Sequence, residues 1–326
     1  MRIHLLAAAA VKAVGPVAPT SRFVAVGGNT IRLFATDGSV EETKPHASWA
    51  FVDVAIGNDM IVAVSNSTQQ VAYKPLVGGS WTIKSVPNAI STAWRAVVFL
   101  DGRFYLFGNG PTATTRLMST ADCVTWDVIS LSDSANEVYF KMSSFNGKLL
   151  VPTRDINRVK SIDPVSKVIT QHDANFGGSN YYPFAFKVVN GKPFALGQGR
   201  KISVGTIVGG VIQPDLLLKV SGGGVTAHVR DVEYSPSLGL YVAVGTSGSG
   251  QGTAPVMYTS PDAETWTLSA TIASKVGAAV GIQSILCLGG DLYMGCNNGK
   301  IMKTSDLVNF TEFSTFPAEV FNIKQY

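Results

Sequence analysis

The chain has 326 residues, of which 46% are hydrophobic and 15% are charged, so one domain can bury a large core. Its net charge of +4 comes from scattered Lys and Arg residues without a basic run, which argues against nucleic acid as a partner. Three Cys are too few for a disulfide framework, and we expect them to be free packing residues.

The N-terminus admits two interpretations. Residues 1–11 combine Arg2 and His4 with an apolar run, as in a minimal signal peptide, which would imply a secreted protein. Lys12 interrupts this run, however, and residues 11–15 already have the pattern of a first strand. We therefore favour an uncleaved N-terminal strand. No apolar stretch is long enough to cross a membrane, and we expect no membrane insertion.

An apolar run that ends in a small residue recurs along the chain. Clear copies occupy residues 23–27, 61–65, 105–108, 194–197 and 241–245, with looser copies at residues 149–152 and 292–295. Before most copies stands another apolar strand and a turn such as Asp101-Gly102 or Asn190-Gly191. Asp-Gly and Asn-Gly between apolar runs predict tight hairpins, because these residues tolerate the positive φ that such turns need.

A second phrase follows several of these hairpins: a hydroxyl residue, any residue, Asp, two free positions, Thr or Asn, and a large aromatic. Its hydroxyl, Asp and aromatic positions are Thr120, Asp122 and Trp126; Ser260, Asp262 and Trp266; and Thr304, Asp306 and Phe310. A phrase repeated in register indicates that one supersecondary unit has been copied.

The unit is therefore strand, turn, strand, loop, strand, Asp-containing turn, strand, with a period of roughly 45 residues. Seven copies fit the chain, with second strands near residues 23, 61, 104, 149, 193, 241 and 292. We predict an all-β, seven-bladed β-propeller of four-stranded antiparallel blades that uses residues 1–326 as one domain. The runs at residues 2–6 and 320–326 have no other place in the repeat, and we expect one or both to close the ring.

The phrase resembles the Asp-box of sialidase-like (BNR) propellers, one residue shorter than the commonest form. The resemblance covers the three clear copies and two degraded ones at residues 161–163 and 36–38. It implies that the Asp lies at the turn between the third and fourth strands, opposite the ligand face. The Asp and the hydroxyl can then bind backbone amides of the turn, while the aromatic packs between blades. We interpret these residues as structural.

A sialidase would need three Arg residues that bind a carboxylate, a Tyr nucleophile with a Glu, and an Asp acid. Arg95 and Arg230 begin equivalent first strands, and Arg154, Arg158 or Arg200 could supply a third. The Arg-Ile-Pro signature of that family is absent, and only Glu137 stands near the start of a first strand. The enzyme is therefore the minority interpretation.

Other catalytic patterns are weaker still. The four His residues are far apart and lack the spacing of metal ligands, so we expect no metal site and no cofactor. The glycine-rich stretches at residues 221–224 and 245–252 precede strands rather than helices, which does not suit a phosphate-binding loop.

In a propeller, the connections between blades share one face with the loops between second and third strands. We expect this loop face to carry any binding site, with residues 154–158, 172–182 and 198–201 as its richest part. The candidate binding residues are Trp94, Arg95, Arg154, Arg158, Tyr181, Tyr182, Arg200 and Arg230. Aromatic rings beside Arg side chains suit both sugars and protein surfaces.

From these observations we predict a non-catalytic structural or interaction module. The chain resembles stand-alone propellers of tailed-bacteriophage particles, which implies a tail- or fibre-associated virion protein whose partners are other virion proteins. The alternative is a glycan-directed protein, a lectin or a sialidase-like glycosidase, that uses the loop face to bind a host-surface glycan.

Overall fold

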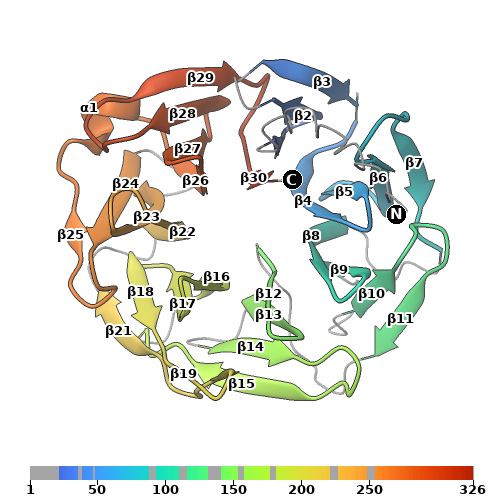
Figure 1. The fold of residues 1–326 in the computed structure, drawn as a ribbon, viewed down its shortest axis with the longest axis horizontal. Coiled ribbons are helices and arrows are strands. Elements are labelled where there is room, and N and C mark those ends of the chain that lie inside the picture. The colour runs from blue at the N-terminus through green and yellow to red at the C-terminus, as the bar shows by residue number, and fades with distance from the viewer. Residues whose placement is uncertain are drawn as a thin grey trace, which may run out of the picture.

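The computed structural model describes residues 22–35, 39–46, 48–87, 93–109, 116–130, 141–152, 158–176, 181–220, 227–247 and 254–325. Within these ranges, seven four-stranded antiparallel sheets form a ring around a central axis (Figure 1). The predicted fold class and blade count are confirmed. The seven expected second strands are also observed, as β1, β5, β9, β13, β17, β23 and β27.

The strands of each blade follow one another from the axis outward. Blade 1 contains β30 (Asn322–Gln325), β1 (Phe23–Gly27), β2 (Thr30–Phe34) and β3 (Val40–Pro45). Blade 2 contains β4 (Phe51–Gly57), β5 (Met60–Ser65), β6 (Gln70–Pro75) and β7 (Thr82–Ser85). Blade 3 contains β8 (Ala93–Leu100), β9 (Arg103–Asn109), β10 (Arg116–Thr120) and β11 (Asp127–Ser130). Blade 4 contains β12 (Ser143–Phe145), β13 (Lys148–Pro152), β14 (Arg158–Ile162) and β15 (Ile169–Asp173).

The remaining blades have the same order. Blade 5 contains β16 (Pro183–Val189), β17 (Lys192–Gly197), β18 (Lys201–Val204) and β21 (Leu217–Val220), with an inserted hairpin of β19 (Ile207–Val208) and β20 (Val211–Ile212). Blade 6 contains β22 (His228–Ser235), β23 (Leu240–Ser247), β24 (Ala254–Ser260) and β25 (Thr267–Leu268). Blade 7 contains β26 (Ile282–Leu288), β27 (Asp291–Cys296), β28 (Lys300–Thr304) and β29 (Thr311–Thr315). One short helix, α1 (Ile272–Val276), connects blades 6 and 7 in the described part of the chain.

The C-terminal strand closes the ring. β30 pairs antiparallel with β1, from Val26 opposite Asn322 to Phe23 opposite Gln325, and becomes the innermost strand of blade 1. This position is the one we expected for residues 11–15, which lie outside the described residues together with residues 2–6. The part of the prediction that concerns residues 320–326 is confirmed.

The tight turns have the backbone conformation that their residues predict. Asp101 and Gly102 have φ values of 47° and 78°, and Asn190 and Gly191 have 45° and 73°. Positive φ at both central residues matches the right-handed twist of the flanking strands, which keeps each inner hairpin regular.

Each junction between neighbouring blades has its own apolar core. Seven clusters of buried side chains occur among the described residues, and each joins two adjacent blades. The three Cys are free, as predicted, and Cys123 and Cys296 are buried in these cores. In this arrangement every sheet is covered on both faces by its neighbours, which explains why the second strands, such as β1, are almost continuously apolar and buried.

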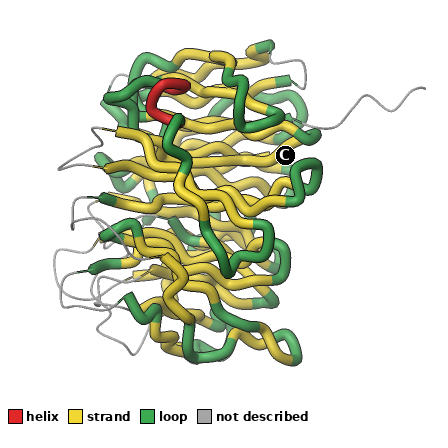
Figure 2. The backbone as a smooth tube through the Cα atoms, turned by 90° about the vertical axis from the view of Figure 1, so that its left-hand side faces the viewer, coloured by secondary structure: helices red, strands yellow, loops and turns green. Residues whose placement is uncertain are grey.

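Seen from the side, the strands run between two faces of the ring (Figure 2). The C-terminus, at the end of innermost strand β30, lies at one face, so the innermost strands begin at the opposite one, the loop face. Among the described residues, no helix is both long and apolar enough to span a membrane.

Candidate functional site

Five of the innermost strands contain a β-bulge at the same place, near their first residues. In each, one residue is skipped in the pairing with the second strand. The skipped residues are Val52, Arg95, Phe184, Arg230 and Gln283. Because a bulge redirects the side chain of the extra residue, we infer that these side chains surround the axis at the loop face. We call these five residues, together with Glu319 just before β30, the axial mouth.

The Arg230 side chain has an aromatic setting at this mouth. Its guanidinium carbon lies 4.5 Å from the centre of the Phe184 ring of the neighbouring blade. Its Nη2 lies 3.2 Å from Nδ1 of His228, and the His228 ring in turn lies 4.6 Å from the Phe184 ring. A cation on an aromatic face is stabilised by the ring quadrupole and keeps a fixed orientation.

Arg230 and Glu319 influence each other across the mouth. Burial lowers the pKa of Arg230 to about 10, against the opposing effect of Glu319. Burial raises the pKa of Glu319 to about 7, against the charge of Arg230. At neutral pH, Glu319 is therefore partly protonated, while Arg230 keeps its positive charge.

Below the mouth, a buried carboxylate connects several blades. Asp231 follows Arg230 on β22, and its oxygens accept hydrogen bonds from Lys141 at 2.8 Å and Lys187 at 3.1 Å. Lys141 precedes β12 in blade 4 and passes the small Ala185 of blade 5 to reach Asp231 in blade 6 and the carbonyl of Gln283 in blade 7. Burial alone would raise the pKa of Asp231, but the two ammonium groups hold it well below its usual range. Asp231 is therefore a poor proton donor at neutral pH.

Asp53 occupies the equivalent position on β4 with different partners. Its carboxylate accepts hydrogen bonds from the backbone N–H of Val54 and of Val97 in the next blade, and from the side-chain amide of Asn322. Burial raises the pKa of Asp53, against the charge of Lys324 and these hydrogen bonds. Asp231 connects blades in the same way, through the backbone N–H of Val232 and Ile285.

Gln283 offers a buried polar group at the mouth. Its side chain is only 5% exposed, and its Nε2 has no hydrogen-bond partner among the residues that the structure describes. The backbone carbonyl of Gln283 accepts a hydrogen bond from Lys141, whereas the buried Nε2 is an unsatisfied donor.

The structure separates the predicted binding residues. Arg95 and Arg230 both lie at the mouth, whereas Trp94 is fully buried in the core between blades 2 and 3, so its expected place on the binding surface is wrong. Its neighbour Arg95 belongs to the axial mouth instead, because the β-bulge between Trp94 and Ala96 removes Arg95 from the regular pairing. Arg158 is exposed at the start of β14, and Arg154 lies outside the described residues.

Tyr181, Tyr182 and Arg200 lie around the turn between β17 and β18, and Tyr182 directly precedes β16. The ammonium group of Lys201 lies 4.4 Å from the centre of the Tyr181 ring, and the N–H of Tyr182 donates to Gln198. Arg200 occupies the turn itself with a φ of 56°. The patch expected from residues 172–182 is smaller than predicted, because His172 is 1% exposed and lies beneath the inserted hairpin.

The three Asp phrases form one kind of turn, between the third and fourth strands of blades 3, 6 and 7. Asp122 accepts hydrogen bonds from the backbone N–H groups of Val124 and Thr125 at 2.8 and 2.7 Å, and Asp262 and Asp306 make the equivalent pairs. These bonds lower the pKa of all three carboxyls, that of Asp306 to about 2. The hydroxyls of Thr120, Ser260 and Thr304 bind the Asp, while Trp126, Trp266 and Phe310 pack against the junction cores.

Sequence reasoning missed the inner carboxylates and lysines. The signal was present, because Asp or Asn precedes Val or Ile on three innermost strands, at Asp53, Asp231 and Asn322. Their contacts were not visible, because each joins blades far apart in sequence. No cluster of His, Cys, Asp and Glu suited to a metal ion occurs in the described ranges.

No protein-family model matches the chain, and no curated protein matches it either. Similar solved structures exist. A functionally unknown protein from Desulfotomaculum acetoxidans DSM 771 has a TM-score of 0.66 and 14% identity, with 94% of this chain and 98% of that one covered. YCF48 from Cyanidioschyzon merolae has a TM-score of 0.61 and 14% identity over 87% and 95% of the two chains. A catalytically inactive virginiamycin B lyase from Staphylococcus aureus, solved with quinupristin, has a TM-score of 0.65 and 14% identity. The match covers 88% of this chain and 96% of that one. At these identities the likeness establishes the propeller fold alone.

Proposed function

We propose that this propeller is an interaction module whose axial mouth binds an acidic segment of a partner protein and performs no reaction there. The observation that supports the proposal is the set of five equivalent bulges, which remove Arg95, Phe184, Arg230 and Gln283 from the regular pairing near the start of their innermost strands. Bulges recur at functional positions because they aim a side chain away from the regular sheet.

The charge of the mouth favours an acidic partner. Arg230 is charged near pH 7 although burial lowers its pKa to about 10, while Glu319 is partly neutral because burial raises its pKa to about 7. Arg and Phe together are typical of the energetically important positions of protein interfaces.

The carboxylates beneath the mouth support binding rather than catalysis. Asp231 is held by two lysines and two backbone N–H groups, and Asp53 by two backbone N–H groups and Asn322. Asp231 accepts four hydrogen bonds and Asp53 accepts three, so both carboxylates are held within the scaffold, which supports a structural role for them.

A peptide-bound propeller is among the similar structures. YCF48 bound to D1 peptide has a TM-score of 0.56 and 12% identity to this chain, and it supports protein recognition as a use of this fold. We further propose that the chain is a tail- or fibre-associated component of a tailed-bacteriophage particle. Its low charge and 33 glycines are compatible with assembly into a particle.

The second candidate is binding of an acidic glycan. It is favoured by Arg95 and Arg230, which stand at equivalent bulges of blades 3 and 6, and by the Phe184 and His228 rings beside Arg230, because a guanidinium group can bind a sugar carboxylate. Arg154, Arg158 and Arg200 were the sequence candidates for a third guanidinium, and neither Arg158 nor Arg200 belongs to the axial mouth.

The binding proposal is tested by fluorescence anisotropy with a labelled poly-aspartate peptide and a neutral Gly-Ser peptide. We expect the wild-type chain to bind the acidic peptide preferentially, and Arg95→Glu to weaken it by at least about tenfold, because like charges then face each other. Lys275→Glu, an exposed change on α1 away from the axis, is the matched control for net charge. Equal binding of the two peptides, or equal losses in the two variants, would contradict the proposal.

Two further measurements separate the particle and glycan alternatives. Mass spectrometry of purified phage particles should detect the chain if it is a virion protein, and its absence from the particles would exclude that role. A signal on a glycan array that Arg95→Glu abolishes, or cleavage of a fluorogenic sialoside, would instead favour the glycan-directed function.

A further inference from the structure

Blade 4 departs from the other blades at its Asp-containing turn. Asp163 accepts hydrogen bonds from the N–H groups of Val165 and Ser166, both at 2.9 Å, as the intact turns would predict. In the intact copies, however, the hydroxyl two residues earlier binds the Asp, as Ser260 does to Asp262 at 3.0 Å. In blade 4 that hydroxyl belongs to Ser161, and it instead binds Nε2 of His172 at 2.9 Å.

The hydrogen bonds of His172 define the direction of the Ser161 bond. Nδ1 of His172 lies 3.1 Å from the carbonyl oxygen of Gln213, which can only accept, so Nδ1 carries the ring proton. In the neutral ring Nε2 is then an acceptor, and the Ser161 hydroxyl donates to it. A serine that donates to a histidine whose other nitrogen is held by a third group has the arrangement of a nucleophile and its base.

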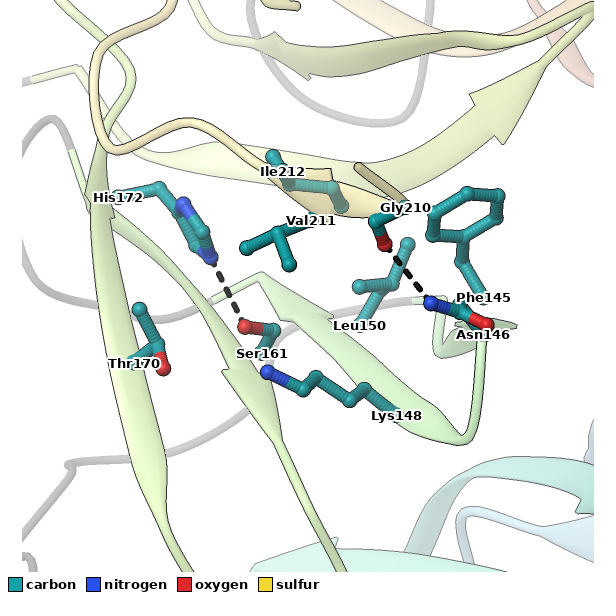
Figure 3. A pocket seen from close by; sticks show the side chains of 10 residues that line it. All are labelled: Phe145, Asn146, Lys148, Leu150, Ser161, Thr170, His172, Gly210, Val211 and Ile212. Carbon is teal, nitrogen blue, oxygen red and sulfur yellow. Dashed lines mark hydrogen bonds between the residues drawn. The ribbon is translucent and has the colours of Figure 1, made fainter. Parts of the chain in front are cut away.

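An inserted hairpin covers Ser161 and His172. The hairpin β19–β20, inserted in blade 5, lies over β13, β14 and β15 of blade 4 (Figure 3). Asn146 donates to the carbonyl of Gly210 at 2.8 Å, and Asn175 donates to that of Leu216 at 2.8 Å, so the insertion is fixed to blade 4. Three features that distinguish this region from the other blades therefore lie together at the junction of blades 4 and 5: the changed partner of Ser161, the histidine that it binds, and the inserted hairpin.

Between the hairpin and the blade lies a small cavity of about 40 Å³. Its roof and wall are apolar, formed by Phe145, Leu150, Val211 and Ile212, while Ser161, Thr170, His172 and Lys148 supply polar groups (Figure 3). This volume accommodates roughly three water-sized groups, which corresponds to a short acyl chain.

We propose that Ser161 and His172 are the nucleophile and base of a second site, which hydrolyses esters of short acyl groups. Oγ of Ser161 forms a bond to the ester carbonyl carbon while its proton passes to Nε2 of His172. The ester C–O bond then breaks, and the departing alkoxide takes that proton. Water repeats the sequence on the acyl-serine and releases the acid, so the balance is ester plus water to acid plus alcohol.

Two surrounding groups support this chemistry. Burial lowers the pKa of His172, against its hydrogen bond to Gln213 and with the help of Lys148, so the ring is neutral and able to accept a proton at neutral pH. Lys148 extends beside Ser161 in the cavity, where its positive charge can stabilise the oxyanion of the tetrahedral intermediate (Figure 3).

The test uses the full chain with p-nitrophenyl acetate, followed by mass spectrometry of the quenched protein. We expect a burst of nitrophenolate and one acetyl group on Ser161. His172→Gln should slow acetylation of Ser161 by about 100-fold or more, as expected when a general base is lost. Hexanoate esters should react more slowly than acetate, since the cavity holds only a short acyl chain.

Ser260→Ala removes the equivalent hydroxyl of blade 6 and should leave the rate unchanged, as should Lys275→Glu on the exposed side of α1. Because the modified residue is identified in the wild-type chain, the result does not depend on whether Ser161→Ala folds. Acetylation confined to lysines, or an unchanged rate in a folded Ser161→Ala variant, would overturn the proposal.

Discussion

The contrast between Asp231 and Asp53 leads to a quantitative prediction. Both carboxylates stand at the same position of an innermost strand and accept backbone hydrogen bonds from their own and the next blade. They differ in charge environment, because Asp231 forms ion pairs with two lysines, while Asp53 accepts from the neutral amide of Asn322 and has only the charge of Lys324 against its burial. Replacement of each by Asn should therefore have unequal effects.

The magnitude follows from the partners that each change leaves behind. In Asp231→Asn, Lys187 keeps Glu233 at 2.8 Å, but Lys141 loses its ion pair with Asp231 and keeps the Gln283 carbonyl at 2.9 Å. Removal of one member of a buried pair typically costs about 3–5 kcal/mol. In Asp53→Asn, burial already disfavours the charge, so the loss is about one hydrogen bond, roughly 1–2 kcal/mol.

The free energies of unfolding are measured by guanidinium denaturation at pH 7. Because the pKa of Asp231 is lowered, its contribution is complete above the unfolded value of about 3.9 and is lost as the pH falls through the folded value. The difference between the unfolding free energies of Asp231→Asn and Asp53→Asn should therefore have its full value at pH 7. A gap below about 1 kcal/mol would refute the inference that the lysines distinguish these positions.

Three further predictions concern stability. Deletion of residues 322–326 removes β30, including the buried Ile323 and the hydrogen bond between Asn322 and Asp53. It should lower the free energy of unfolding, measured by denaturant titration, by more than about 3 kcal/mol. An unchanged denaturation midpoint would show that another segment closes the ring. Thr120→Val leaves the buried N–H of Cys123 without its acceptor at 2.9 Å and should cost about 1–3 kcal/mol, whereas a neutral effect would deny the turn a structural role. Because burial lowers the pKa of His172, its neutral form stabilises the fold above the unfolded value of about 6.5, and that contribution is lost as the pH falls below it. The melting temperature of His172→Gln should accordingly fall less between pH 7 and pH 5 than that of the wild-type chain. Equal decreases in the two proteins would contradict this prediction.

Much of the scaffold could be predicted because its signals are local. The Asp-Gly and Asn-Gly turns depend on two residues each, and the seven apolar second strands repeat at a nearly constant interval. The Asp turns likewise close within six residues, so their hydrogen bonds follow from the phrase itself. Local signals of this kind add up over repeats, and the ring then follows from the need to cover every sheet.

The candidate site was harder to predict, because its geometry depends on a register shift. Trp94 and Arg95 are neighbours in sequence, but the bulge between Trp94 and Ala96 places the Trp in the core and leaves the Arg at the mouth. Simple alternation along a strand cannot foresee this, since one extra residue reverses the direction of the side chains. Lys141 illustrates the same limit, because it contacts residues 90 and 142 positions away.

The repeat itself provides a way to separate scaffold from function. Equivalent positions of the blades normally make equivalent contacts, because every blade packs in the same way. A residue that keeps its repeat position but contacts a different partner no longer makes the contact that this packing uses. Ser161 holds the position of Thr120, Ser260 and Thr304, yet its hydroxyl binds His172, and Asp163 is held by the N–H groups of Val165 and Ser166 and by the Ser166 side chain. Asp163 still forms the turn, so the scaffold does not require this change. A partner exchange without a structural need is therefore the feature that points to chemistry at Ser161, and the same comparison can be made blade by blade in any propeller.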